Sequence, residues 1–245
     1  MPCTLTYISP GGATYELFTG RYKEPFIEQD SLTGFVGTFE DNPVETVGVP
    51  GARVDFRDRV IRSIEGEFAA VVFNRAQWAQ LRRDFSTRRA GELVLDCGQG
   101  AYHLKVRLRA PLPSPSVVPD MGTRLVVGLV ADGGVWESFV SAPGPVVTVT
   151  NPGDVPIWPV VVWNGAGGAV TLPSGAVFTL PRVTQECRLP LDRMAGGRAL
   201  PTSGDGAPVV VDMVGECVPV DQSRTYRVPA GARLEYTIGV FDPWI

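Results

Sequence analysis

Short apolar runs separated by turn residues constrain the fold of this chain more than any other feature of its sequence. From Val146 onward, about seven such runs follow one another at intervals of roughly 8–15 residues, with Gly, Pro, Asn or Asp between them. No helical periodicity interrupts the series. This pattern is typical of a sandwich of two packed sheets. The runs are PVVTVT, PIWPVVVW, AVTLPSG, VFTLP, PVVVDM, RTYRV and RLEYTIGVF.

Residues before this series predict a second β domain that carries one helix. A buried strand from Phe68 to Phe73 precedes the helix, and a hairpin follows it, made of ELVLDC and AYHLKVRLRA around GQG. The proline-rich stretch APLPSPSVVPD is expected to be a stiff connector within this part. We therefore expect a mainly β chain with two domains, residues 1–143 and residues 144–245, divided near SAPGP.

The helix is predicted from its cap and its apolar stripe. Asn74 can accept a hydrogen bond from a free amide of the first turn. Trp78, Leu81 and Phe85 then fall on one helical face. Such a stripe can form an aromatic ligand site, but we favour a helix that lies on a sheet.

Two segments alternate between apolar and polar residues. In residues 52–64 the apolar members are Val54, Phe56, Val60 and Ile64, which predicts a strand with one packed and one wet face. The second strand of the hairpin alternates in the same way. Its expected core residues are Tyr102, Leu104, Val106 and Leu108, and its outward residues are His103, Lys105, Arg107 and Arg109.

The segment NPGDVPIWPVVVWNG is expected to form one strand of the sandwich. Pro156 and Pro159 predict an edge strand or a bulged start, because proline cannot donate to a sheet ladder. The Asn-Gly pair at its end favours a turn with positive φ.

Charge argues against nucleic-acid recognition. Residues 1–118 hold 14 basic and 14 acidic residues, so the net charge of −4 arises in the remainder. The densest basic cluster follows the helix, and we interpret it as a solvated face with salt bridges rather than a phosphate-binding patch. We expect no sequence-specific nucleic-acid partner. The cluster consists of Arg82, Arg83, Arg88 and Arg89.

Reactive side chains are few. His103 is the only histidine, and nearby cations make it a poor general base. No nucleophile elbow, phosphate loop or calcium loop occurs. We therefore expect no enzyme, and no catalytic, cofactor-binding or metal site. The four cysteines lack metal-finger spacing, and we expect buried free thiols at Cys3, Cys97, Cys187 and Cys217.

No apolar run approaches the roughly 18 residues that span a bilayer, and the first residues lack a signal-peptide pattern. We expect a soluble protein without membrane insertion, made in a cytoplasm.

The order of these elements resembles the distal tail protein (Dit) family of long-tailed phages. Four stretches carry the resemblance across nearly the whole chain. The segment LPLDRMAGGRALPTSGDGAPVVVD is longer and richer in glycine than the family pattern. The four stretches are FAAVVFNRAQWAQLRRDF with the hairpin after it, RLVVGLVADGGVWESF, VTVTNPGDVPIWPVVVWNG and YRVPAGARLEYTI.

The resemblance implies a structural virion protein at the tail tip, assembled in the host cytoplasm. Residues 1–143 would form a β-barrel-like belt domain that closes into a ring, commonly a hexamer. Residues 144–245 would form a galectin-like β-sandwich. The ring would join the tail tube protein to the tip or baseplate hub protein, leave a channel for DNA, and contact the tape measure protein.

A second hypothesis is a carbohydrate-binding sandwich that attaches to a host glycan. Exposed indole rings stack on sugars, whereas core indoles only pack. The candidate side chains are Trp136, Trp158, Trp163 and Trp244.

Overall fold

The computed structural model describes residues 3–18, 24–114, 122–203 and 206–245, with the side chain of Arg57 excepted. The prolines of the predicted connector lie partly outside these ranges. The chain forms two compact units. The first consists of Met1–Trp136 together with Phe241–Ile245, and the second of Glu137–Val240. The sequence-based boundary at residue 143 falls at the end of strand β13, which begins at Trp136.

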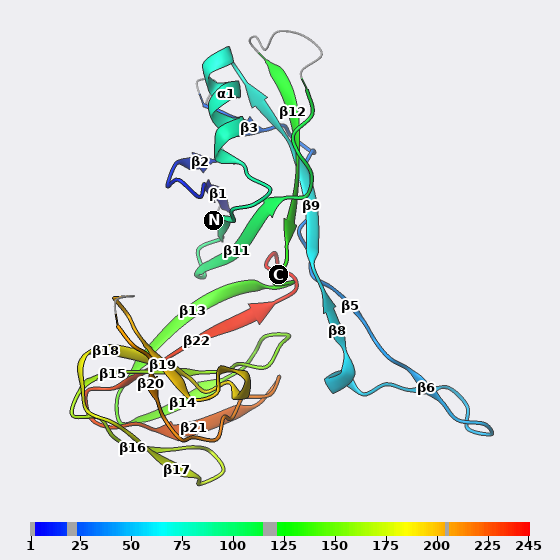
Figure 1. The fold of residues 1–245 in the computed structure, drawn as a ribbon. Coiled ribbons are helices and arrows are strands. Elements are labelled where there is room, and N and C mark those ends of the chain that lie inside the picture. Colours follow the sequence, from blue (N-terminus) through cyan, green and yellow to red (C-terminus); the bar gives the residue numbers. More distant parts are fainter. Residues whose placement is uncertain (1–2, 19–23, 115–121, 204–205) are drawn as a thin grey trace. The chain divides into compact units, whose positions relative to one another are not determined.

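Most of the secondary structure in the first unit consists of strands, as the sequence predicts. One α-helix and one 3-10 turn, η1 (Phe56–Asp58), complete it (Figure 1). Its elements are β1 (Thr4–Ile8), β2 (Thr14–Glu16), β3 (Phe26–Ile27), β4 (Thr33–Gly34), β5 (Thr38–Glu40), β6 (Val44–Glu45), β7 (Ala52–Arg53), β8 (Val60–Arg62), β9 (Ile64–Val72), α1 (Arg75–Asp84), β10 (Gly91–Asp96), β11 (Ala101–Leu108) and β12 (Thr123–Ala131).

A strongly curved sheet makes the first unit barrel-like. Its hydrogen-bonded order is β2-β1-β10-β11-β12-β9, and β9 pairs further with β3 and β4. The amide of Ile27 in β3 donates to the carbonyl of Leu17, just after β2, at 3.1 Å. This bond links the two ends of the sheet, as barrel closure requires.

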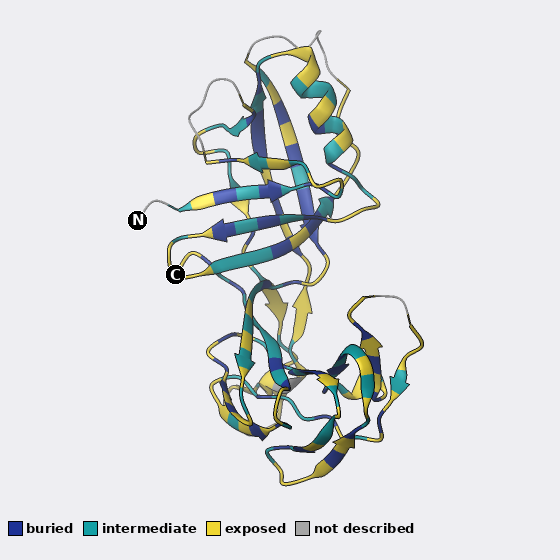
Figure 2. Cartoon of the chain, turned by 90° about the vertical axis from the view of Figure 1, so that its left-hand side faces the viewer, coloured by how far each residue is buried: buried dark blue, intermediate teal, exposed yellow. Residues whose placement is uncertain are grey.

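The predicted hairpin is confirmed. β10 and β11 pair antiparallel from Gly91↔Val106 to Asp96↔Ala101. Leu104, Val106 and Leu108 are buried, whereas Tyr102 is half-buried. Along β10, buried residues alternate with half-buried or exposed ones, and Figure 2 shows how buried, half-buried and exposed residues are distributed over the strands.

The helix lies on the sheet, as expected from its stripe. The side chain of Asn74 accepts from the amide of Gln77 at 2.9 Å, which confirms the cap. Leu81 and Phe85 are buried, and the Phe85 ring stacks on Tyr7 with ring centroids 4.0 Å apart. The aromatic stripe is therefore used for packing.

The second unit is a sandwich of two sheets with one core. One sheet has the order β13-β22-β15-β18-β19-β20 and the other β14-β21-β16-β17. Val149, Val170 and Tyr226 of one sheet pack with Val161 and Leu189 of the other. Its elements are β13 (Trp136–Pro143), β14 (Val146–Thr150), β15 (Val160–Gly165), β16 (Gly168–Thr171), β17 (Val177–Leu180), β18 (Val183–Pro190), η2 (Arg193–Ala195), β19 (Arg198–Pro201), β20 (Val209–Val210), β21 (Ser223–Arg227) and β22 (Arg233–Val240).

Two expectations about this sandwich are wrong. The strand after Pro159 is not an edge strand, because β15 pairs with β18 on one side and β22 on the other. Both prolines precede β15, and the carbonyl of Pro159 accepts from the amide of Leu191 at 2.8 Å, one step beyond the Val160↔Pro190 pair. The sequence pattern also missed β18 and β19, whose residues lie in or beside the glycine-rich stretch. The expected positive φ after Asn164 is present at Gly165.

The expectation of four free thiols is wrong for one pair. Cys3 and Cys97 form a disulfide, with Cα atoms 4.1 Å apart. They extend the β1–β10 register one step beyond Thr4↔Asp96. Residues 94 positions apart become neighbours through the sheet, which spacing in the sequence cannot reveal. Cys187 and Cys217 are free.

Candidate assembly and binding surfaces

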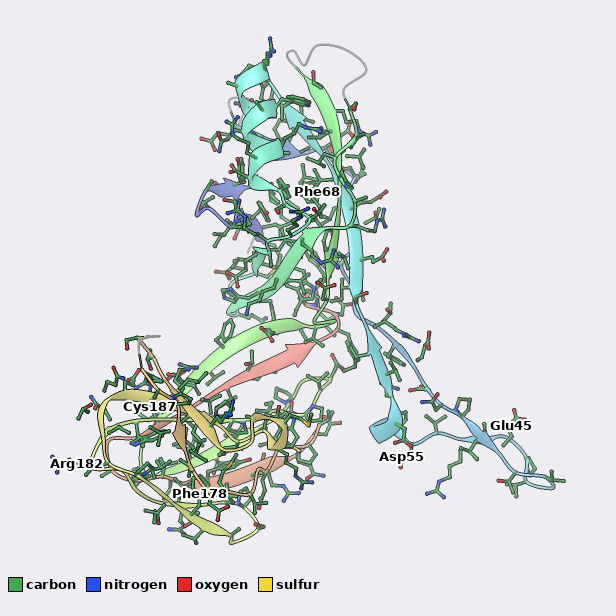
Figure 3. The ribbon with its side chains drawn as sticks, in the orientation of Figure 1. Glu45, Asp55, Phe68, Phe178, Arg182 and Cys187 are labelled. Atoms are coloured by element: carbon green, nitrogen blue, oxygen red, sulfur yellow. A yellow bond between two sulfur atoms is a disulfide. The ribbon has the colours of Figure 1, made fainter. Side chains whose placement is uncertain are left out.

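A two-stranded arm, residues 38–63, is the most exposed part of the first unit. β5 pairs with β8, and β6 pairs with β7, and among the described residues these strands join no other sheet. Apart from the undescribed Arg57 side chain, no residue from Thr38 to Ser63 is buried. Figure 3 shows the arm as a thin ribbon that carries Glu45 and Asp55.

Ion pairs and a cation–π contact join the two sides of the arm. Arg59 binds both carboxylate oxygens of Asp41, with Nε–Oδ1 at 2.7 Å and Nη2–Oδ2 at 3.2 Å. The same guanidinium lies over the Phe39 ring at 3.5 Å from its centroid. Arg62 pairs with Glu40 on the opposite strand. These contacts define the ribbon although it has no core of its own.

The arm presents large apolar side chains to solvent. Val47 and Phe56 have exposed fractions of 103% and 71%. The alternating pattern around Phe56 and Val60 predicted a packed face, and that expectation is wrong within this chain, because only Ile64 of that set is buried. An alternating pattern predicts an apolar face, but it does not predict whether that face packs against the same chain or against a partner. The exposed apolar residues of the arm are Phe39, Val44, Val47, Val49, Phe56, Val60 and Ile61.

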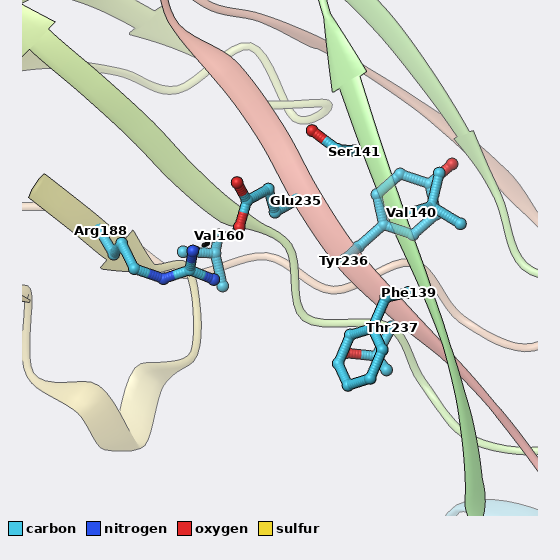
Figure 4. Close-up of a pocket in the computed structure, with 8 residues that line it drawn as sticks. All are labelled: Phe139, Val140, Ser141, Val160, Arg188, Glu235, Tyr236 and Thr237. Atoms are coloured by element: carbon cyan, nitrogen blue, oxygen red, sulfur yellow. Dashed lines mark ion pairs between the residues drawn. The ribbon is translucent and has the colours of Figure 1, made fainter. Parts of the chain in front are cut away.

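The second candidate surface is a depression of about 280 Å³ in the sandwich unit (Figure 4). It lies over strands β13, β22, β15 and β18. Phe139 leaves 59% of its surface exposed there. Arg188 and Glu235 form an ion pair at 2.5 Å. The lining residues are Phe139, Val140, Ser141, Val160, Arg188, Glu235, Tyr236 and Thr237.

Two of the four tryptophans that were candidates for glycan binding are buried in the core. Trp136 is fully buried and donates to the carbonyl of Phe35 at 2.8 Å. Trp163 is 2% exposed and donates to the carbonyl of Pro181 at 3.0 Å. Trp158 is half-buried, and Trp244 is 39% exposed. A sugar-binding role therefore cannot rest on Trp136 or Trp163.

Two arginines of the basic cluster, Arg82 and Arg83, lie on the helix and make contacts within the chain. Arg82 donates to the carbonyls of Leu112 and Pro113, at 3.0 and 2.6 Å, and lies over the Trp78 ring. Arg83 donates to Gln80. Arg82 thus bonds to backbone carbonyls instead of the predicted salt bridges. Arg88 and Arg89 are exposed.

His103 lies half-buried on β11, with Nδ1 3.3 Å from the Glu92 carboxylate. This carboxylate comes from the neighbouring strand β10, opposite Lys105 in the register. The sequence of one strand could not reveal it.

In the described part of the chain, no three His, Cys, Asp or Glu side chains are grouped so that they could hold a metal ion. None of the described helices is both long and apolar enough to cross a membrane.

Comparison with known proteins gives a result only at the level of structure. No protein-family model matches the sequence, and no curated protein matches it. The Dit protein (gp 19.1) of phage SPP1, described as a paradigm of the hub adsorption apparatus of phages that infect Gram-positive bacteria, superposes with a TM-score of 0.60. It shares 11% identity, and the match covers 98% of this chain and 99% of that one.

The chain has a Dit-like fold. Two structures of the phage P2 baseplate in its activated conformation agree with this result. The structure with Ca gives a TM-score of 0.58 at 9% identity, covering 97% of this chain and 98% of that chain. The structure with Sr gives 0.56 at 8% identity with the same coverage. Because both units are covered, the Dit-like fold describes the whole arrangement of strands along the chain, and not one domain alone.

Proposed function

We propose that this chain is a structural, non-enzymatic protein of a phage tail tip that assembles with copies of itself into a closed ring. The Dit-like fold supports a place among tail-tip and baseplate proteins. The single observation that carries self-assembly is the arm of residues 38–63, which exposes seven large apolar side chains and has no buried residue among those whose side chains are described. Isolated two-stranded ribbons are marginally stable, so such an arm is best explained by a partner surface that covers it.

A ring follows if each arm binds the next copy. A heterologous contact relates each copy to the next by a fixed rotation, and the copies close into a ring when a whole number of these rotations makes 360°. Six copies would match the expected hexamer. The open borders of β5 and β8 allow strand pairing with a neighbour, and the valines near β6 and β7 add apolar burial. In this proposal the ring joins the tail tube to the hub, with the tape measure protein as a further neighbour in the virion.

The ring would leave a channel through which DNA slides. The first 118 residues hold equal numbers of basic and acidic residues, so they supply no general attraction for phosphates. A strongly positive channel surface in the assembled particle would count against this part of the proposal.

The native mass of the purified chain tests the ring. We expect about six copies of the 26.3 kDa chain by light scattering after size exclusion. Replacing residues 43–56 with two glycines should leave both units folded and give a monomer. Val177→Ser, which removes a valine of 62% exposure from the sandwich, is the control and should keep the large mass. A wild-type protein that stays monomeric at its solubility limit would refute arm-driven assembly.

Carbohydrate binding is the second candidate function. The depression that contains Phe139, Arg188 and Glu235 favours it, in place of the buried tryptophans.

A further inference from the structure

The depression in the sandwich unit is built on the face of its sheet turned away from the core. Leu234, Leu189 and Val161 belong to the core. Successive side chains of a strand point to opposite faces, so their neighbours Glu235, Arg188 and Val160 lie on the other face. On β13, Ala142 packs against the core, which places Phe139 and Ser141 on that same outer face. Four strands thus bring one mixed polar and apolar surface together.

A row of alternating charges fixes the polar side of the depression. Glu235 binds Arg188 through Oε2 at 2.5 Å and Arg233 through Oε1 at 2.8 Å. Arg233 also binds Glu186 at 2.7 Å, and the Thr202 hydroxyl donates to Glu186 at 3.1 Å. Both carboxylates use both of their oxygens. The row therefore holds its side chains in one conformation before any ligand arrives, which lowers the entropy lost on binding.

One of these contacts makes the Glu186 carboxylate a hydrogen-bond acceptor rather than an acid. The hydrogen bond from Arg233 holds the pKa of Glu186 below its usual range. Glycoside hydrolysis needs one carboxyl group that stays protonated to serve as an acid. Glu186 does not meet this need, so the surface suits binding better than cleavage.

The most exposed apolar side chain of the depression is the Phe139 ring, which exposes 59% of its surface. Val160 also lines the depression and is half-buried. Figure 4 shows Phe139 next to Thr237, and Val160 next to the Arg188–Glu235 pair. A ligand that fits must offer an apolar face to the ring and hydroxyl groups at its edge. Two arginines and two glutamates sum to no net charge, so the surface favours neither anions nor cations.

We propose that this depression binds a neutral pyranose ring of a surface polysaccharide. The C–H face of the sugar lies on Phe139. Arg188 donates to ring hydroxyls, and the hydroxyl groups of Ser141 and Thr237 complete the rim. About 280 Å³ is at the lower limit of small-molecule sites, which suits one or two sugar units. Few contacts in an open site give a dissociation constant on the order of 1 mM. This inference rests on carbohydrate binding as the second candidate function, for which it names the sugar class and the contacts, and it does not depend on the assembly of a ring.

Saturation-transfer NMR on the full chain tests the proposal. The probes are the methyl glycosides of glucose, galactose and N-acetylglucosamine, each in excess. We expect transfer to the C–H protons of at least one sugar. Phe139→Ala should reduce this transfer about tenfold, Arg188→Gln should weaken it by a similar factor, and Phe139→Trp should retain it.

Phe56→Ala is the matched control, because it removes an exposed phenyl ring from the arm, at 71% exposure against 59% for Phe139, and should leave the sugar signal unchanged. The thermal midpoint of each variant verifies folding. Two results would overturn the proposal: no transfer from any of the three glycosides to the wild-type chain, or full transfer in the Phe139→Ala variant. Either result leaves the native-mass test of the ring unaffected, so the two proposals fail separately.

Discussion

The indole N–H groups of Trp136 and Trp163 each donate to a backbone carbonyl within their own unit, and both rings are shielded from water. A large side chain with one polar atom stabilises a core only when that atom finds a partner. Both residues meet this condition through a carbonyl far away in sequence. Their role is therefore to anchor each core, and the proposed sugar stacking rests on Phe139 instead.

Replacing Trp136 with Phe should destabilise the first unit by about 2–4 kcal/mol. The change leaves the carbonyl of Phe35 without its donor and creates a small cavity. Urea unfolding followed by circular dichroism measures this loss. Trp244→Phe is the control, since Trp244 is 39% exposed, and its effect should stay within about 0.5 kcal/mol. Equal effects of the two changes would contradict the anchoring role.

At the scale of elements, the first strand is held to the sheet by a covalent bond as well as by hydrogen bonds. β1 pairs with β10 from Thr4↔Asp96 to Ile8↔Glu92, and the Cys3–Cys97 disulfide closes the end of this ladder. The bond restricts a chain segment of 94 residues in the unfolded state. Long loops lose the most entropy on closure, so the disulfide contributes to stability mainly through the unfolded chain.

Replacing Cys97 with Ser should lower the stability of the first unit by about 2–4 kcal/mol. The urea midpoint of the variant is compared with that of the oxidised wild-type chain. Adding dithiothreitol to the wild-type chain should reproduce the shift, whereas the variant should not respond. Cys217→Ser, which removes a free thiol, serves as control. A wild-type midpoint that is insensitive to the reductant would show that the disulfide carries no stability.

At the scale of the whole molecule, the chain returns to its first unit at the end. Phe241–Ile245 belong to that unit although the 104 residues Glu137–Val240 come between. The amide of Gly37 donates to the carbonyl of Phe241 at 2.8 Å, and the Phe241 ring lies 5.5 Å from that of Phe39. The last residues therefore support the base of the arm.

Removing residues 241–245 should destabilise the first unit by about 2–4 kcal/mol and loosen the base of the arm, because it exposes the surface around Gly37 that Phe241 covers. Hydrogen exchange should rise at Gly37 and Phe39. Exchange within the sandwich core, for example at Val161 and Val170, is the internal control and should not change. Unchanged exchange at Gly37 would contradict a supporting role for the final residues.

The sequence by itself determined the elements whose causes are local. The hairpin around GQG, the cap at Asn74 and the sandwich strands other than β18 and β19 follow from side-chain period and turn chemistry, and the structure confirms them. Only a few neighbouring residues are needed to specify each of them. The resemblance in element order likewise rested on local motifs, and the Dit-like fold agrees with it.

Only the tertiary structure decided which surfaces are covered. The alternation around Phe56 and the alternation around Val106 both predict a packed face, yet the first lies open on the arm and the second lies in a core. The Cys3–Cys97 bond, the central place of β15 and the grouping of Phe139 with Arg188 have the same origin. Each depends on strands that are distant in sequence and adjacent in a sheet, and periodicity within one strand carries no record of its neighbours.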